Sequence, residues 1–141
     1  MISVQESDFN VAHEYEVLSS GDNTGAIVTF VGRVRDFGEG SFLLQHYPGM
    51  TERVLSKIEQ QARSKWQINA CRVIHRVGQL SVNDQIVFVG VSSAHRHEAF
   101  DACHFIIDIL KTQAPFWKKE GETWVDAKSS DDTAADKWLR D

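Results

Sequence analysis

The sequence contains little cysteine: Cys71 and Cys103 are the two cysteines among 141 residues. They lie far apart in the chain and match neither a CxxC pair nor the spacing of a zinc-binding motif. The pair allows one disulfide, but two free thiols in a reducing compartment are favoured. A disulfide-stapled fold and a cysteine-ligated zinc site are therefore not expected.

Long hydrophobic runs are also missing. No apolar stretch approaches the roughly 20 residues that a membrane-spanning helix needs. Residues 1–10 contain Glu6 and Asp8 and lack the apolar centre of a signal peptide. These features predict a soluble, cytoplasmic protein with no membrane partner.

Positive charge is not in excess. The chain has 15 Lys and Arg residues against 20 Asp and Glu residues, a net charge of −5. General nucleic-acid binders are usually basic, so no nucleic-acid partner is expected. The acidic surplus is concentrated in the C-terminal segment, residues 120–141, which holds seven acidic and three basic residues. The rest of the chain is nearly neutral, so a local basic site is compatible with the acidic total.

The length of 141 residues suits one domain spanning residues 1–141. Apolar spacing predicts helices at residues 11–20, 51–66, 94–112 and 133–139, with Thr51 as the N-cap of the second. Runs of β-branched and apolar residues predict strands at residues 26–34, 41–46, 70–77, 86–91 and 122–127, the first two as a candidate hairpin. The mixed order of helices and strands favours an α+β fold over a doubly wound sheet.

The start of the long helix forms the first candidate site, where His95 and Arg96 follow Ser92 and Ser93. The first turn of a helix presents free backbone N–H groups and a partial positive charge, which favour an anion such as phosphate. The same residues fit a plain helix start, in which a serine caps the helix and Arg96 points to solvent. Taken alone, the segment slightly favours the plain interpretation.

Two further groups of basic residues are candidates. Lys111 and Lys118 flank the turn 115–117, and Arg33 and Arg35 end the first predicted strand on one face of it. A lysine among other cations and aromatic walls can have a lowered pKa and act as a base, a nucleophile or an anion anchor. Taken alone, each group is more typical of a solvated surface.

A histidine and carboxylate row lies on the long helix. His97, Asp101 and His104 recur every three or four residues, so they share one helical face. These residue types ligate metals, but the row is not an HExxH motif and has no evident third strong ligand. A solvated face or an interface is favoured over a metal site.

Five blocks of sequence follow one another at compatible spacing: VTFVGRVR (28–35), HYPGMTE (46–52), VIHRVG (73–78), VFVGVSSAHR (87–96) and LKTQAPFWKKE (110–120). Each block is weakly diagnostic alone, but all five in this order are highly specific. Together they resemble the large, catalytic subunit of molybdopterin synthase, the MoaE family. The resemblance extends from about residue 9 to residue 138.

The resemblance implies a sulfurtransferase. The family installs the two dithiolene sulfurs of molybdopterin on cyclic pyranopterin monophosphate. The sulfur arrives as a thiocarboxylate on the C-terminal Gly-Gly of a small ubiquitin-like partner subunit. The family assembles as a heterotetramer around a central homodimer of large subunits. Its fold is α+β, an α/β-hammerhead with an antiparallel sheet.

The resemblance also implies roles for individual residues. Lys111 is expected to meet the thiocarboxylate and to stabilise charge as sulfur leaves the carbonyl, and Lys118 to bind substrate and transfer protons. Lys128 stands where the family pattern has arginine. The partner supplies the sulfur, so neither cysteine needs to react. No cofactor is expected, and no metal is needed because molybdenum enters later in the pathway. The implied substrate-binding residues are expected to converge on one pocket, within one subunit or across a subunit boundary: Arg35, His95, Arg96, Lys111, Lys118 and, as a weaker candidate, Lys128.

Two other functions fit some of the same residues. A phosphate- or tail-binding module would share the basic pocket without catalysing any reaction. A metalloenzyme would use His97, Asp101 and His104. Turnover with a thiocarboxylated partner separates the first alternative from the enzyme, and a metal assay tests the second.

Overall fold

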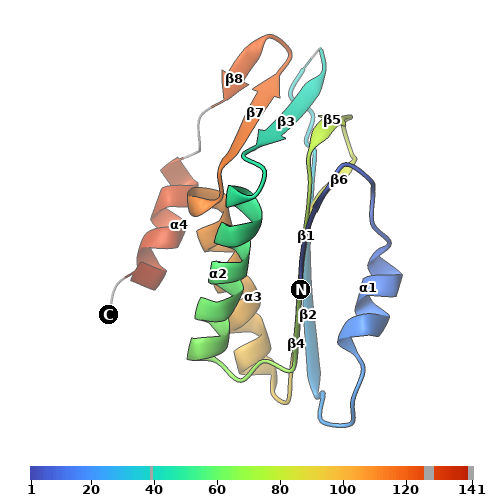
Figure 1. Ribbon diagram of the computed structural model, residues 1–141, viewed down its shortest axis with the longest axis vertical. Coiled ribbons are helices and arrows are strands. Elements are labelled where there is room, and N and C mark those ends of the chain that lie inside the picture. The colour runs from blue at the N-terminus through green and yellow to red at the C-terminus, as the bar shows by residue number, and fades with distance from the viewer. Residues whose placement is uncertain (39, 126–128, 140–141) are drawn as a thin grey trace.

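The structure of the protein is a computed structural model that describes residues 1–38, 40–125 and 129–139. Within these residues the chain forms eight β-strands and four α-helices, with the strands arranged in two four-stranded sheets. Figure 1 shows the first sheet along the length of the molecule with helices on both of its faces, and the second sheet at one end. The predicted α+β class is confirmed.

The first sheet has the strand order β1-β4-β6-β2. Its strands are β1 (Ile2–Gln5), β4 (Ala70–Arg76), β6 (Gln85–Ser93) and β2 (Ala26–Arg33). β1 is parallel to β4, and the other pairs are antiparallel. β6 lies in the interior of the sheet and is buried on both faces, as its nearly continuous apolar run predicts.

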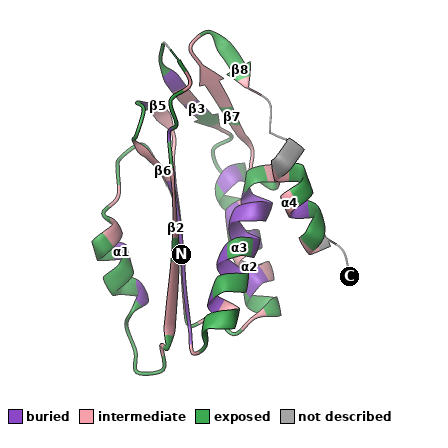
Figure 2. Ribbon diagram, turned by 180° about the vertical axis from the view of Figure 1, so that it is seen from behind, coloured by how far each residue is buried: buried purple, intermediate pink, exposed green. Residues whose placement is uncertain are grey.

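Helices cover both faces of the first sheet (Figure 1). α1 (Val11–Leu18) lies on one face, and α2 (Met50–Lys65) and α3 (Arg96–Gln113) lie on the other. α4 (Ser129–Leu139) packs against α3. Figure 2 shows that much of α3 is buried, whereas α1 is mostly exposed.

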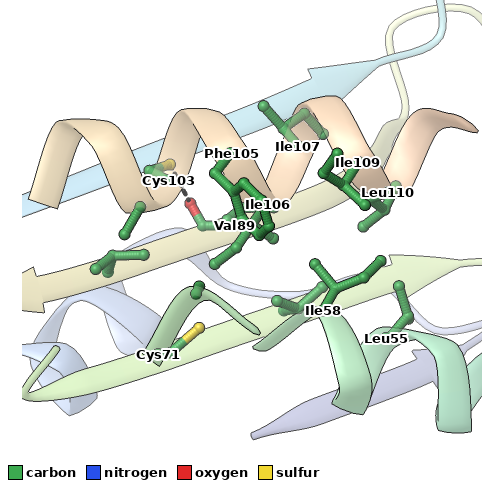
Figure 3. Close-up of a cluster of buried hydrophobic side chains, with 14 of the residues drawn as sticks. Leu55, Ile58, Cys71, Val89, Cys103, Phe105, Ile106, Ile107, Ile109 and Leu110 are labelled. Atoms are coloured by element: carbon green, nitrogen blue, oxygen red, sulfur yellow. Dashed lines mark hydrogen bonds between the residues drawn. The ribbon is translucent and has the colours of Figure 1, made fainter. Parts of the chain in front are cut away.

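The main hydrophobic core lies between α2, α3 and the first sheet (Figure 3). Both cysteines belong to it as free, buried thiols, and Cys103 Sγ donates a hydrogen bond to the Val89 carbonyl at 3.6 Å. Burial raises the pKa of Cys71 and of Cys103 to about 12. Both thiols therefore stay protonated and unreactive at neutral pH.

The second sheet has the order β5-β3-β7-β8 and lies beyond the C-terminal end of α3. Its strands are β5 (Gly78–Leu80), β3 (Phe42–His46), β7 (Phe116–Glu120) and β8 (Thr123–Val125). A smaller apolar cluster of Val34, Phe42, Leu44 and Leu80 packs at its inner side. This sheet places residues of β7 opposite the last turn of α3.

The candidate hairpin between residues 26–34 and 41–46 is wrong. β2 pairs with β6, whereas β3 pairs with β5 and β7 in the other sheet. Strands β1, β5 and β7 were not predicted at all. Each of them is short, and each is defined by pairing with a strand far away in the sequence, which local residue patterns do not report.

The start of α2 also differs from the prediction. The N-cap is Gly49, with φ of 85°, and the Glu52 side chain accepts a hydrogen bond from the Gly49 N–H at 3.1 Å. Thr51 is fully buried, and its hydroxyl donates to the Tyr47 carbonyl at 2.8 Å. Glycine adopts a positive φ at little cost, so the chain can turn at Gly49 and continue directly into the first residues of the helix.

Among the described residues, no helix combines the length and the hydropathy that a membrane crossing requires.

The aromatic side chain beneath α1 tests how this helix is held. Phe88 is 0% exposed, packs with Leu18 and Ile74, and forms a T-shaped contact with the Phe9 ring. Phe88→Ala is expected to lower the free energy of unfolding in urea by about 3–5 kcal/mol, because it leaves a cavity. The matched change Phe100→Ala, at a side chain on α3 that is 61% exposed, should cost no more than about 0.5 kcal/mol. Equal losses in the two variants would contradict this packing.

Candidate active site

A cavity of about 160 Å³ opens where the two sheets meet the C-terminal end of α3. Its volume is close to that of an engineered cavity of roughly 150 Å³ that holds a benzene ring. Apolar side chains from both sheets and from α3 form most of the wall. The polar and charged side chains at its lining are Arg33, His75, Lys111, Lys118 and Asp131.

The packing of α3 positions Lys111. Its predicted core stripe is confirmed, because Ala99, Ala102, Cys103, Ile106, Ile109 and Leu110 are all buried. Lys111 follows this stripe in the last helical turn, where a cation is favoured by the exposed carbonyl groups. The helix ends two residues later, at Gln113, just before Pro115, which cannot continue a helix. Lys111 therefore projects from a fixed helix end into the cavity mouth.

Strand pairing positions Lys118. In the second sheet Lys118 of β7 lies opposite Leu44 of β3 and Val125 of β8, and all three line the cavity. Side chains alternate along a strand, so Trp117 and Lys119 point to the other side of the sheet. The segment that the sequence suggested was a turn is thus a strand. This strand separates two adjacent lysines into one that faces the cavity and one that does not.

The cations around the cavity act on one another. Although Lys111 is exposed at the mouth, the apolar walls partly remove water from its ammonium group, and this desolvation lowers its pKa. The positive charges of Lys118 and Arg35 lower it further, while the Asp131 carboxylate acts in the opposite direction. Among the described residues, two cations thus act on Lys111 against one carboxylate, and a bound anion would relieve the repulsion.

The two arginines take different positions. β2 ends at Arg33, whose Nε donates a hydrogen bond to the Asn83 carbonyl at 3.2 Å. Arg35 lies beyond the strand and is exposed, so alternation along a strand does not place it. Its charge nevertheless acts on Lys111. Arg35 is not among the residues that line the cavity, so its assignment to the same anion pocket as Lys111 and Lys118 stays a prediction.

His95 and Arg96 lie at the opposite end of α3. His95 is the N-cap, and Arg96 begins the helix. At 1.5 Å per residue, Arg96 is about 22 Å along the helix axis from Lys111. Both residues are exposed, and neither Ser92 nor Ser93 caps the helix with its side chain. The expected convergence of all five basic residues therefore does not occur within one chain, and Lys128 lies outside the described residues.

His75 also lines the cavity, although no sequence motif marks it as a candidate. It is the sixth residue of β4, only 6% exposed, and its ring stacks on the Phe116 ring at a centroid distance of 3.8 Å. Burial lowers its pKa to about 4, and the charge of Lys111 adds to this effect, so the imidazole is neutral at pH 7. In the sequence, His75 could be recognised only as a histidine inside a strand that is expected to be buried. That pattern is equally typical of a histidine with a purely structural role.

The row of His97, Asp101 and His104 gains no further metal ligand from the fold. Within the part of the chain that the structure describes, no three histidine, cysteine or acidic side chains come close enough to hold a metal ion. His104 instead contacts Asp108 at 3.2 Å, and Asp108 accepts a hydrogen bond from the Trp138 indole at 2.6 Å. These contacts attach α4 to α3.

Comparisons with known proteins agree on one family. The model of the family described as MoaE protein matches residues 4–113. The molybdopterin synthase catalytic subunit of Vibrio cholerae is 54% identical over 97% of each chain. The solved structure of a molybdopterin biosynthesis MoaE protein from Burkholderia ambifaria is 45% identical, with a TM-score of 0.86 over 100% of this chain and 99% of that one.

A more distant structure shares the fold. It is a complex of subunits 1 and 2 of the molybdopterin-converting factor from Helicobacter pylori, with 18% identity and a TM-score of 0.75 over 91% of this chain and 90% of the other. The match to the family model and the identity to the Vibrio protein extend over most of the sequence. This chain belongs to the MoaE family.

Proposed function

We propose that this chain is the catalytic subunit of a molybdopterin synthase. It transfers sulfur from the C-terminal thiocarboxylate of a small ubiquitin-like subunit to cyclic pyranopterin monophosphate and so forms the dithiolene of molybdopterin. The observation that carries the proposal is that Lys111 and Lys118 line one partly desolvated cavity. The chain that carries them is similar to catalytic subunits over nearly its whole length.

The charges of the cavity suit these reactants. The thiocarboxylate and the substrate phosphate are both anions. Cations in a partly desolvated site bind anions more strongly than cations in bulk water do. Lys111 pairs with the thiocarboxylate and stabilises the charge that develops when the acyl carbon–sulfur bond breaks. Lys118 binds the substrate and transfers protons, and Arg35 adds charge at the mouth. Holding the two reactants close together supplies the remaining rate enhancement.

The thiols of the chain take no part in sulfur delivery. Both are buried in the core and protonated at neutral pH, so neither is a nucleophile. The sulfur atoms come from the partner subunit, and a dithiolene needs two of them. Two loaded partners are therefore consumed for each substrate. The free thiols also fit the reducing conditions of the cytoplasm, where we place the reaction.

We further propose that His95 and Arg96 bind substrate from a second copy of the chain. Both side chains are exposed at a helix N-terminus, which suits a phosphate, yet they are too far from Lys111 of their own chain. In a two-fold symmetric homodimer each copy offers the same surface to its partner, so a shared site is formed twice. The small subunits would bind at the two outer ends to give a heterotetramer.

The roles of the lysines are tested by turnover. With purified chain, thiocarboxylated partner and cyclic precursor, mass spectrometry should detect molybdopterin. Lys111→Ala and Lys118→Ala are each expected to reduce the rate by at least about 100-fold, since each removes charge stabilisation or proton transfer. The control is Lys119→Ala, next in the strand but on its other face, which should keep nearly full activity. Equal rates in all three variants would contradict the proposal, and a wild type that binds both reactants without turnover would favour the binding module.

The shared site is tested by mixing two inactive variants. Lys111→Ala and Arg96→Ala dimers should each be inactive, whereas co-expressed chains should recover roughly a quarter of the wild-type activity. Half of randomly assembled dimers are mixed, and each mixed dimer has one intact site of its two. No recovery in dimers shown to be mixed would place His95 and Arg96 outside the site.

The electrostatics of Lys111 predict a pH effect. Only the ammonium form stabilises the departing sulfur, so kcat/KM should fall on the alkaline side, at a pH below the ordinary lysine pKa of about 10.5. Asp131 raises the pKa of Lys111, so Asp131→Asn should move this fall to lower pH. The neighbouring exposed change Asp132→Asn should leave it in place. A shift to higher pH in Asp131→Asn would contradict the assignment.

A further inference from the structure

The buried histidine of the cavity has one ring nitrogen fixed by the backbone. His75 Nδ1 lies 2.9 Å from the carbonyl oxygen of Arg76. A carbonyl oxygen only accepts hydrogen bonds, so Nδ1 carries the proton and donates it. A neutral imidazole has a single N–H, and the other nitrogen, Nε2, is therefore an acceptor.

The orientation of the ring is fixed as well. The Phe116 ring covers one side of it at an interplanar angle of 17°. On either side of β4, Val4 of β1 and Val87 of β6 lie opposite His75 in the sheet. The stacking and the backbone hydrogen bond together leave the imidazole little freedom to turn. Nε2 thus has a defined position rather than an average over rotamers.

The free nitrogen reaches the cavity. Among the residues that the structure describes, Nε2 has no hydrogen-bond partner, and the one fully buried side-chain polar atom without a partner is Ser92 Oγ. Nε2 therefore retains contact with accessible space, and His75 lines the cavity. An acceptor that is held in place and open to the cavity is free to accept a hydrogen bond from a donor group of the occupant.

The neighbouring polar side chains are less suited than His75 to accept a hydrogen bond from an occupant of the cavity. Lys111 and Lys118 are donors without acceptor capacity, and Asp131, the carboxylate of the lining, interacts with Lys111. Protonation of His75 would place one more positive charge beside Lys111, and burial opposes this as well. Among the described side chains of its lining, the cavity thus combines cations, which suit an anion, with the neutral acceptor of His75, which suits a donor.

We propose that His75 is a substrate-positioning residue whose Nε2 accepts a hydrogen bond from an N–H group of the cavity's occupant. The inference rests on the proposed function, which brings two occupants with such groups. One is the pterin ring, with its ring and amino N–H groups, and the other is the Gly-Gly tail of the partner, with its backbone N–H groups. In either case the cations hold the anionic part of the ligand while His75 fixes its orientation.

The protonation and contact of Nε2 can be observed directly. The full-length chain labelled with nitrogen-15 at histidine is examined by NMR at pH 7, alone and with three probes: a pterin without phosphate, a short peptide ending in Gly-Gly, and inorganic phosphate. His75 is expected to be protonated at Nδ1 only. The pterin or the peptide should shift its Nε2 resonance, which identifies the source of the N–H group, and phosphate should not. A charged His75, a proton on Nε2, or no response to pterin and peptide would overturn the proposal.

Substitutions give a second measurement. His75→Phe keeps the stacking ring and removes both nitrogens, so affinity for the responding probe should fall about tenfold while phosphate affinity is unchanged. His75→Gln, which restores an acceptor near Nε2, should recover part of the loss. The control is His46→Phe, at a histidine that also contacts Phe116 but does not line the cavity, and it should bind normally. Equal loss of phosphate and probe affinity in His75→Phe would indicate a structural role.

The two proposals can fail separately. If wild-type chain shows no sulfur transfer, the proposed function fails whatever the NMR result. If it transfers sulfur while Nε2 responds to neither N–H probe, the role of His75 fails alone. Should His75→Phe not fold, the NMR measurement on the wild type still decides.

Discussion

Helix α3 buries nine of its eighteen residues, and this burial helps to hold two lysines from consecutive elements, Lys111 of α3 and Lys118 of β7, at one cavity. The apolar stripe fixes the rotation of the helix on the first sheet, and Pro115 fixes where it ends. The chain then returns as β7, which pairs with β3 and turns Lys118 toward Lys111. If α3 were rotated or longer, the two ammonium groups would not face the same space.

The cost of this arrangement is electrostatic. The charges of Lys118 and Arg35 repel that of Lys111, whose ammonium group is partly desolvated by apolar walls. Within the part of the chain that the structure describes, the Asp131 carboxylate partly offsets the repulsion. Such a site stays tolerable because Lys111 and Arg35 remain exposed, and it becomes favourable when an anion enters. The geometry therefore suits a negatively charged ligand that binds transiently better than a permanent structural ion pair.

Much of the fold could be predicted from local patterns. The stripe of α3 and the buried run of β6 follow directly from apolar periodicity. The placement of Lys118 could not be predicted, because the strand that carries it lies between β8 and β3, and β3 is about seventy residues earlier in the sequence. His75 was missed for a related reason. Its significance comes from Phe116 and Lys111, which the fold brings close, and not from its neighbours in the sequence.

The assignment of His95 and Arg96 illustrates a different limit. A motif identifies residues but gives no distance between them, and an eighteen-residue helix separates this pair from Lys111. Residues at the two ends of one helix can serve one site only if another copy supplies one of the ends. The sequence blocks were thus compatible with a shared pocket, while the length of α3 excludes a pocket built from a single chain.

The most direct test of the central claim is a crystal structure of this chain with a small subunit whose tail ends in Gly-Gly. The tail should enter the cavity at the junction of the two sheets, with its terminal carboxylate within hydrogen-bond distance of Lys111 Nζ and close to Lys118. A tail that ends elsewhere on the surface, with the cavity empty, would contradict the assignment of this cavity as the site of sulfur transfer.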